Sequence, residues 1–285
     1  MSRYRNAAIP VLAAVALAIP AVAANAATSQ PADEAATDSG GLIHYQFEPS
    51  TLPDARFESV NGIAGSDASC VFEEGSLANP QEGYVEVGTE VSYDPATCES
   101  TYAVAVYPID EVPDTVIQEY LGGAVAFESF IAGAQQEQAA EQEQAAASSA
   151  DVVIMAAQSA SLMTAYRDPV LLHVTRATTN LNWTGTNTCI SAASATHPTY
   201  HLTATGWSRT SMTPSFTFSC SQAYANTNAK FKNDAFCPGS GNTTYTNHTG
   251  THVYGYPGGP SSHSRTMTKS GGCNNLLHTT YAWTP

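Results

Sequence analysis

Alternating apolar and polar residues form the clearest pattern in this chain. Between Tyr84 and Tyr93 one set of alternate positions is Val, Thr or Tyr, and the other is Tyr, Glu, Gly or Ser. Such alternation predicts a half-buried strand whose Glu-bearing face is wet. A turn at 94–97 (DPAT) and the run TYAVAVY at 101–107 predict a second strand. With shorter runs near residues 42 and 70, these strands predict a small β unit over 42–110.

A helical period replaces this alternation after residue 111. Large apolar residues recur every three to four positions across 117–131, after a capping-box pattern at 115–118. Residues 134–148 have high helix propensity but almost no large apolar side chains, so they fit a solvated helix or a disordered tether equally well. Residues 152–166 fit either a helix or a strand. We therefore expect a helical connector, partly low-complexity, over 111–166.

From residue 167 the chain becomes rich in Thr, Ser, Asn and Gly. Short β-like runs alternate with turn clusters, which predicts an antiparallel sandwich or barrel-like domain over 167–285. Within it, residues 223–237 are interpreted as a short helix. The expected fold class is mainly β, α+β overall.

The first 27 residues have the form of a secretory signal peptide. Two arginines precede an apolar run at 7–20, and the small-residue motif ANA at 24–26 resembles a cleavage site. The acidic, Pro-containing residues 28–41 predict a flexible mature N-terminus. The expected location is secreted and extracellular, with no membrane span.

Six cysteines in an exported chain predict disulfide bonds, because the extracellular environment is oxidising. Six cysteines allow 15 pairings, and their spacing favours one in which each bridge stays within its own half of the chain. The pairs are Cys70–Cys98, Cys189–Cys220 and Cys237–Cys273. The rival interpretation, a zinc site, lacks any C-x-x-C pair. No metal and no cofactor is expected.

The two halves of the chain carry opposite charge. Residues 28–166 hold 23 Asp/Glu and one basic residue, and residues 167–285 hold seven Lys/Arg and two acids. One hypothesis is that the acidic half folds over the basic half and masks its positive face, as a pro-segment would. The alternative is that the negative charge only keeps the exported chain soluble.

The basic half resembles the C-terminal half of small secreted actinobacterial proteins that have no assigned function. The resemblance covers about 115 of the 285 residues and rests on these positions: Asp168-Pro169, Trp183, Cys189, Thr205-Gly-Trp-Ser208, Cys220, Phe236-Cys237, Ser270-Gly-Gly-Cys273 and Leu276-Leu277. It implies secretion and a disulfide-bonded, β-rich domain, and it carries no catalytic residue.

Signals for catalysis are weak. The basic half has only two carboxylates, so the usual carboxylate pair of a glycosidase is not expected there. The histidine pairs His197/His201 and His248/His252 have i, i+4 spacing, but on strands they lie too far apart to chelate a metal. Histidines with Lys230 and Lys232 could form a nuclease-like site, although the spacing does not require one.

Aromatic residues set among Thr, Ser and Asn suggest a surface that stacks on sugars. The candidate ligand-binding residues are Trp183, Trp207, Tyr254 and Tyr256, and the alternative for them is ordinary packing. The favoured function is a secreted, non-enzymatic extracellular binding or surface-interaction protein, with cell-surface polysaccharide or another anionic polymer as partner. The alternative is a secreted hydrolase or nuclease-like effector with the acidic half as pro-segment.

Overall fold

β-strands dominate the described chain, as the alternating patterns predict. The computed structural model describes residues 43–44, 52–64, 70–73, 81, 83–94, 96–135, 157–237 and 242–285. All of them belong to one compact unit, Ala35–Pro285. The predicted signal peptide, the flexible tail at 28–41 and most of the tether at 134–148 lie outside the described residues.

Nine strands form the first antiparallel sheet, in the order β10-β8-β7-β15-β5-β6-β2, with β1 also paired to β5 and β9 to β8. Their bounds are β1 Ile43–His44, β2 Arg56–Asn61, β5 Tyr84–Asp94, β6 Glu99–Pro108, β7 Gln158–Arg167, β8 His173–Gly185, β9 Ile190–Thr196, β10 Thr199–His201 and β15 His278–Thr284.

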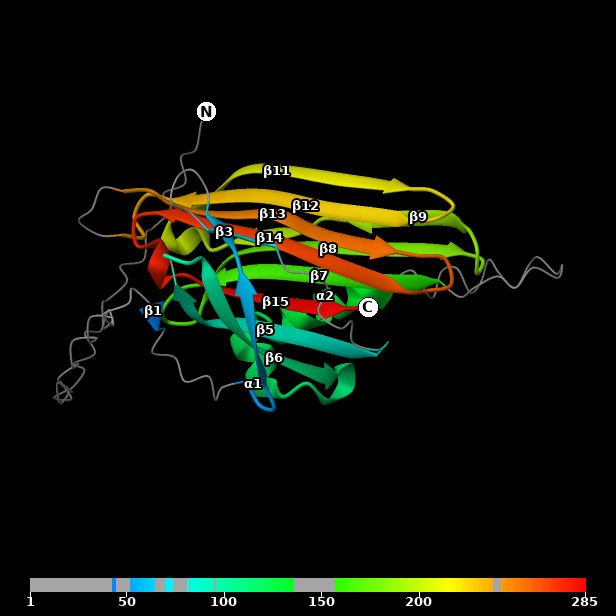
Figure 1. The fold of residues 1–285 in the computed structure, drawn as a ribbon, viewed down its shortest axis with the longest axis horizontal. Coiled ribbons are helices and arrows are strands. Elements are labelled where there is room, and N and C mark those ends of the chain that lie inside the picture. The colour runs from blue at the N-terminus through cyan, green and yellow to red at the C-terminus, as the bar shows by residue number, and fades with distance from the viewer. Residues whose placement is uncertain are drawn as a thin grey trace, which may run out of the picture. The chain divides into compact units, whose positions relative to one another are not determined.

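Six strands form the second antiparallel sheet, in the order β11-β12-β13-β14-β4-β3. They are β3 Ile63–Ala64, β4 Cys70–Glu73, β11 Trp207–Phe218, β12 Ala223–Asn233, β13 Thr244–Gly255 and β14 Ser261–Gly271. In Figure 1 the four long strands run side by side in yellow and orange. Residues 223–233 are therefore a strand, and the expected helix there is wrong. Alanine, threonine and phenylalanine at the odd positions 223–231 alternate with tyrosine, asparagine and lysine at the even positions, which gives one buried face and one more polar face.

Two helices cover one face of the first sheet. Helix α1 (Asp114–Tyr120) and helix α2 (Ala124–Gln135) bury Val116, Phe127 and Phe130 against Val85 and other side chains of β5 and β6. The helical period predicted over 117–131 is thus divided between two helices, with a break at 121–123 that contains Gly122 and Gly123, and α2 continues to Gln135. Residues 158–167, which fit either structure by sequence, form strand β7 beside β15.

The opposite face of the first sheet packs against the second sheet. Apolar clusters around Trp183, Trp283 and Phe231 fill this space. Both faces of β5 are consequently buried, and the wet face expected for its glutamates is wrong. Glu86 and Glu90 are 0% and 3% exposed, because the second sheet covers the face that the sequence pattern assigns to solvent.

Strands from the acidic and basic halves are neighbours in both sheets. β15, near the C-terminus, lies between β5 and β7, and β14 pairs with β4. The boundaries at residues 110 and 166 thus do not coincide with boundaries between the sheets. Because each sheet contains strands of both halves, basic side chains of one half lie against acidic and aromatic side chains of the other.

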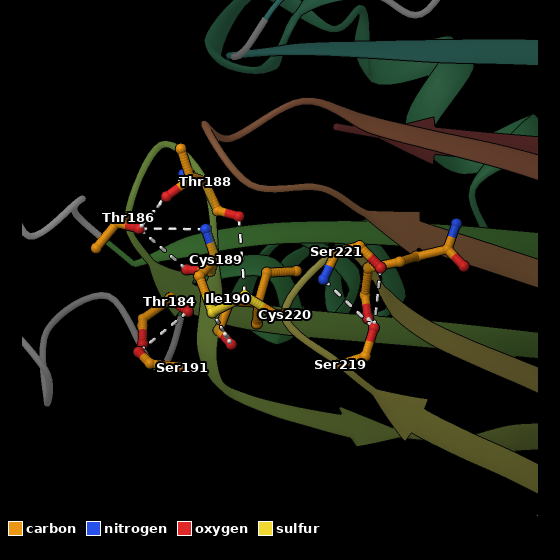
Figure 2. The surroundings of a disulfide bond; sticks show 10 residues. Thr184, Thr186, Thr188, Cys189, Ile190, Ser191, Ser219, Cys220 and Ser221 are labelled. Carbon is orange, nitrogen blue, oxygen red and sulfur yellow. Dashed lines mark hydrogen bonds between the residues drawn. A yellow bond between two sulfur atoms is a disulfide. The ribbon is translucent and has the colours of Figure 1, made fainter.

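Three disulfides join the cysteines in the expected pairs, Cys70–Cys98, Cys189–Cys220 and Cys237–Cys273. Figure 2 shows the second of these, which ties the turn before β9 to the turn after β11. The Thr186 hydroxyl accepts backbone N–H groups of Thr188 and Cys189 there, at 3.3 and 3.1 Å. Among the residues that the structure describes, no helix is long and apolar enough to cross a membrane.

Candidate functional site

The outer surface of the second sheet is the first candidate for a binding site. Its inward side chains, such as Ala225, Phe231 and Val253, are buried in the sandwich, so the alternate positions point outward. We call the outward side chains of β12, β13 and β14 the acid-free face, because β11 to β14 contain no Asp or Glu.

Three strands place the acid-free face in register. Tyr224, Tyr254 and Ser262 lie opposite one another across β12, β13 and β14, and Asn226, His252 and Ser264 form the next row. Further along β12, Lys230 and Lys232 pair with Asn247 and Tyr245. The face therefore has an aromatic end and a cationic end, separated by amides and hydroxyls. Six to eight residues along a strand span about 20–27 Å.

The aromatic end is a set of contacting rings. The Tyr224 and Tyr254 ring centroids lie 5.2 Å apart, and the His252 ring is nearly parallel to that of Tyr254, at 15°. The Tyr224 hydroxyl lies 2.9 Å from His252 Nδ1. All three side chains are half-buried. Mutual packing holds these rings in place and leaves part of each ring exposed to a ligand.

The four predicted binding residues fall into two groups. Tyr254 and Tyr256 lie at the aromatic end, where the Tyr256 hydroxyl is 3.3 Å from Ser262 Oγ. Trp183 and Trp207 are only 3% and 2% exposed, so the prediction that they stack on a ligand is not supported. Trp183 packs on Gly255, where a Cβ would lie 2.6 Å from its ring, and donates to the Tyr256 carbonyl at 3.1 Å.

Sequence reasoning missed Tyr224 and His252. Tyr224 was not identified because residues 223–237 are interpreted as a helix from the sequence. His252 was considered only with His248, as an i, i+4 pair. A register shift between His248 and Gly250 places them on opposite faces of β13, with His248 fully buried. The alternation A-Y-A-N at 223–226 is the signal that could have found the aromatic end.

The histidines and lysines do not form the arrangement that a nuclease-like site needs. Lys230 and Lys232 project from the acid-free face, and none of their cross-strand neighbours is a histidine: Ser211, Asn247, Ser208 and Tyr245. His248 instead lies in the sandwich interior, with its ring nitrogens 2.8 and 3.2 Å from the Thr164 and Thr175 hydroxyls. Within the described residues no group of three His, Cys, Asp or Glu could hold a metal ion.

A buried ionic seam between the sheets explains how the two charged halves meet. Glu90 of β5 pairs with Lys269 of β14, and Glu86 of β5 lies 3.8 Å from the Arg56 guanidinium of β2. Lys269 Nζ lies 2.9 Å from Glu90 Oε2 and donates to the Leu277 carbonyl at 2.8 Å. The Arg265 guanidinium lies over the rings of Tyr102 and Tyr281. Lys269 thus meets the acidic half inside the sandwich, whereas Lys230 and Lys232 project from the acid-free face, so masking of the positive face stays a prediction.

Glu86 is the residue of the seam whose ionised form burial disfavours. Burial raises the pKa of Glu86 to about 7, against the lowering effects of a hydrogen bond from the Tyr281 hydroxyl and of the Arg56 cation. The Tyr281 hydroxyl donates to Glu86 Oε1 at 2.8 Å. No substrate could reach this carboxylate in the structure, because its exposure is 0%. We therefore assign it a role in stability.

Replacing Glu86 with glutamine is expected to stabilise the protein at pH 8. A raised carboxyl pKa means that the folded state holds the proton more tightly than the unfolded state, so ionisation above pH 7 costs about 3 kcal/mol. Glu86→Gln removes that cost and keeps an acceptor for Tyr281. Urea unfolding of the variant and the wild-type protein at pH 8 and pH 4.5 measures the difference in the free energy of unfolding. A gain of equal size at both pH values would contradict this explanation.

Comparison with family models, with curated proteins and with solved structures finds no match. The acid-free face and its register are therefore the basis for any assignment of function.

Proposed function

We propose that the protein is a secreted, non-enzymatic binding protein whose acid-free face holds an acidic polysaccharide of a cell surface. The observation that carries the proposal is the row of half-exposed rings in register with hydroxyls and amides. The charged side chains of these strands on this face are Lys230 and Lys232, the second of which pairs with Asp234 at 2.8 Å just after β12. Aromatic faces suit stacking on sugar rings, amides and hydroxyls suit sugar hydroxyls, and cations attract carboxylate or sulfate groups.

Several sequence features support the extracellular part of the proposal. The N-terminal 27 residues have the form of a signal peptide, and three disulfides are compatible with an oxidising compartment. The resemblance of residues 167–285 to secreted actinobacterial proteins points the same way. The face also lies over strands that are fixed to the core, so binding requires little reorganisation.

Removing two rings should weaken polysaccharide binding at least about tenfold, which corresponds to about 1.4 kcal/mol. The variant is Tyr224→Ala/Tyr254→Ala, and affinity electrophoresis in gels containing polygalacturonate measures the loss. Tyr84→Ala is the matched control, because Tyr84 is a partly exposed tyrosine of β5, in the other sheet. Equal retention of the double variant and the wild-type protein would overturn the stacking role.

Removing the two lysines should change the salt dependence of binding instead. In Lys230→Gln/Lys232→Gln the rings are intact, so the affinity for the polysaccharide at high salt should match that of the wild-type protein. The wild-type protein should bind more tightly at low salt than at high salt, and the variant should not. A salt response that does not change would mean that the cationic end of the face takes no part.

A further inference from the structure

A cleft between the helices and the first sheet holds a cation that has no ion-pair partner among the described residues. The cleft has a volume of about 460 Å³ and opens between the α1–α2 junction and β8 and β10, where Arg176 and His173 line it. This volume lies within the range of small-molecule sites. The cleft and the acid-free face are built from different elements, so the proposal for the cleft does not depend on the proposed polysaccharide binding.

Packing against described residues holds Arg176 in place. Its guanidinium lies over the Tyr200 ring, 5.3 Å from the centroid. Nη1 also approaches the backbone at Gly122, where an added Cβ would lie 3.0 Å away. Burial lowers the pKa of Arg176, and only the Tyr200 hydroxyl opposes that effect. Among the ion pairs of the described residues, none includes Arg176.

His173 adds a second polar group to the cleft. Both ring nitrogens are buried and lack a hydrogen bond of normal geometry to a described residue. Burial, followed by the Arg167 and Arg176 cations, lowers the pKa of His173 to about 3, against a smaller effect of the Tyr120 backbone. The ring is therefore neutral at physiological pH and adds no second charge to the cleft.

The start of helix α2 contributes to the same wall. The helix begins at Ala124, directly after Gly122 and Gly123, and has no acidic residue in its first turn. The N-terminus of a helix carries a partial positive charge, so this end of α2 favours an anion beside Arg176. One guanidinium, one neutral imidazole and one helix end together suit a monoanion.

Apolar side chains form the rim. Val125 and Leu172 line the cleft and are 79% and 51% exposed. Large apolar residues at this exposure lose contact with water when a ligand with an apolar body covers them. Inorganic anions such as phosphate would leave this rim uncovered, whereas an organic acid would use both parts of the site.

We propose that this cleft is a second binding site, for a small organic carboxylate whose carboxylate pairs with Arg176 and whose apolar body covers Val125 and Leu172. A guanidinium can hold a carboxylate through two parallel hydrogen bonds. The first turn of α2 adds backbone donors for the remaining lone pairs. Tyr200 keeps the guanidinium turned into the cleft.

The probes are phenylacetate and its neutral amide, phenylacetamide, titrated into the full chain and followed by NMR or calorimetry, with inorganic phosphate as a third arm. We expect saturable binding of phenylacetate and at least tenfold weaker binding of the amide and of phosphate. Arg176→Gln should weaken phenylacetate at least tenfold. Lys232→Gln is the matched control, since it removes a cation of the acid-free face and should leave phenylacetate binding unchanged.

Leu172→Glu provides a second variant at an exposed position that the fold does not need. The new carboxylate should repel phenylacetate and weaken its binding at least tenfold, whether or not Arg176→Gln folds. The proposal is overturned if the wild-type protein does not bind phenylacetate, if the amide binds equally well, or if Leu172→Glu leaves the affinity for phenylacetate unchanged. Tighter binding of phosphate than of phenylacetate would also overturn it.

Discussion

Lys269→Met is expected to lower the free energy of unfolding by about 3–5 kcal/mol, the usual cost of removing one partner of a buried ion pair. Lys269 and Glu90 are 6% and 3% exposed, so the substitution would leave the Glu90 carboxylate in the interior without its cation. The Ser100 hydroxyl, which donates to Glu90 Oε1 at 2.5 Å, cannot replace that charge. Urea unfolding followed by circular dichroism measures the loss.

Two further variants separate charge from packing. Glu90→Gln/Lys269→Met removes both charges and should recover most of the stability, because no uncompensated carboxylate remains. Lys232→Met is the matched control, since Lys232 pairs with Asp234 at 2.8 Å in a largely exposed position, where ion pairs contribute little. A Lys269→Met protein as stable as the control would show that the seam does not hold the sheets together.

Acidification from pH 8 to pH 4 is expected to destabilise the protein by about 6 kcal/mol through His248, His263, His278 and Glu86 together, and His173, whose pKa burial also lowers to about 3, adds to this loss. Burial lowers the pKa of His248 and His278 to about 3, and that of His263 to about 4. A His pKa lower in the folded than in the unfolded state means that the unfolded chain binds more protons. Stability is then fully present above pH 6.5 and falls as the pH decreases towards the folded pKa.

Glu86 acts in the opposite direction. Its pKa is raised, so the folded state gains stability as the pH falls from about 7 to 4.5. At pH 4, His248, His263 and His278 together lower the free energy of unfolding by about 9–10 kcal/mol relative to pH 8. Protonation of Glu86 raises it by about 3 kcal/mol. Glu86→Gln should therefore steepen the acid loss, whereas His263→Phe, beside the Trp283 ring at 4.5 Å, should reduce it. A free energy of unfolding that stays constant between pH 8 and pH 4 would contradict the burial of these histidines.

Local pattern predicted the strands and the disulfides because both depend on near neighbours. The alternation at 84–93 and the period at 117–131 give the elements that the structure contains, and cysteine spacing gives the three bridges. The pattern could not show which other element would pack on each face of a predicted strand. Glu86 and Glu90 alternate with valines as a wet face would, yet the second sheet lies over them. Lys269 of β14 pairs with Glu90, and Tyr281 and Arg56 of the first sheet lie beside Glu86.

The candidate sites depend on pairings that are distant in sequence. Tyr224 and Tyr254 are neighbours only once β12 and β13 are in register, and Arg176 meets Gly122 only across the helix–sheet contact. The tryptophans drew attention because of their size, but large rings also fill sandwich cores well, and this is where Trp183, Trp207 and Trp283 lie. Alternation at 223–233 carried the missing information, and alanine in place of valine obscured it.

The central claim is that the acid-free face, formed by the outward side chains of β12, β13 and β14, binds an acidic polysaccharide. The most direct measurement compares polygalacturonate with its fully methyl-esterified form, which has the same sugar backbone without the charge, by equilibrium binding of the full chain at roughly 20 mM and 500 mM salt. We predict saturable binding of polygalacturonate that weakens at high salt, and weaker, salt-independent binding of the ester. Equal binding of the two polymers, or no binding of either, would contradict the claim.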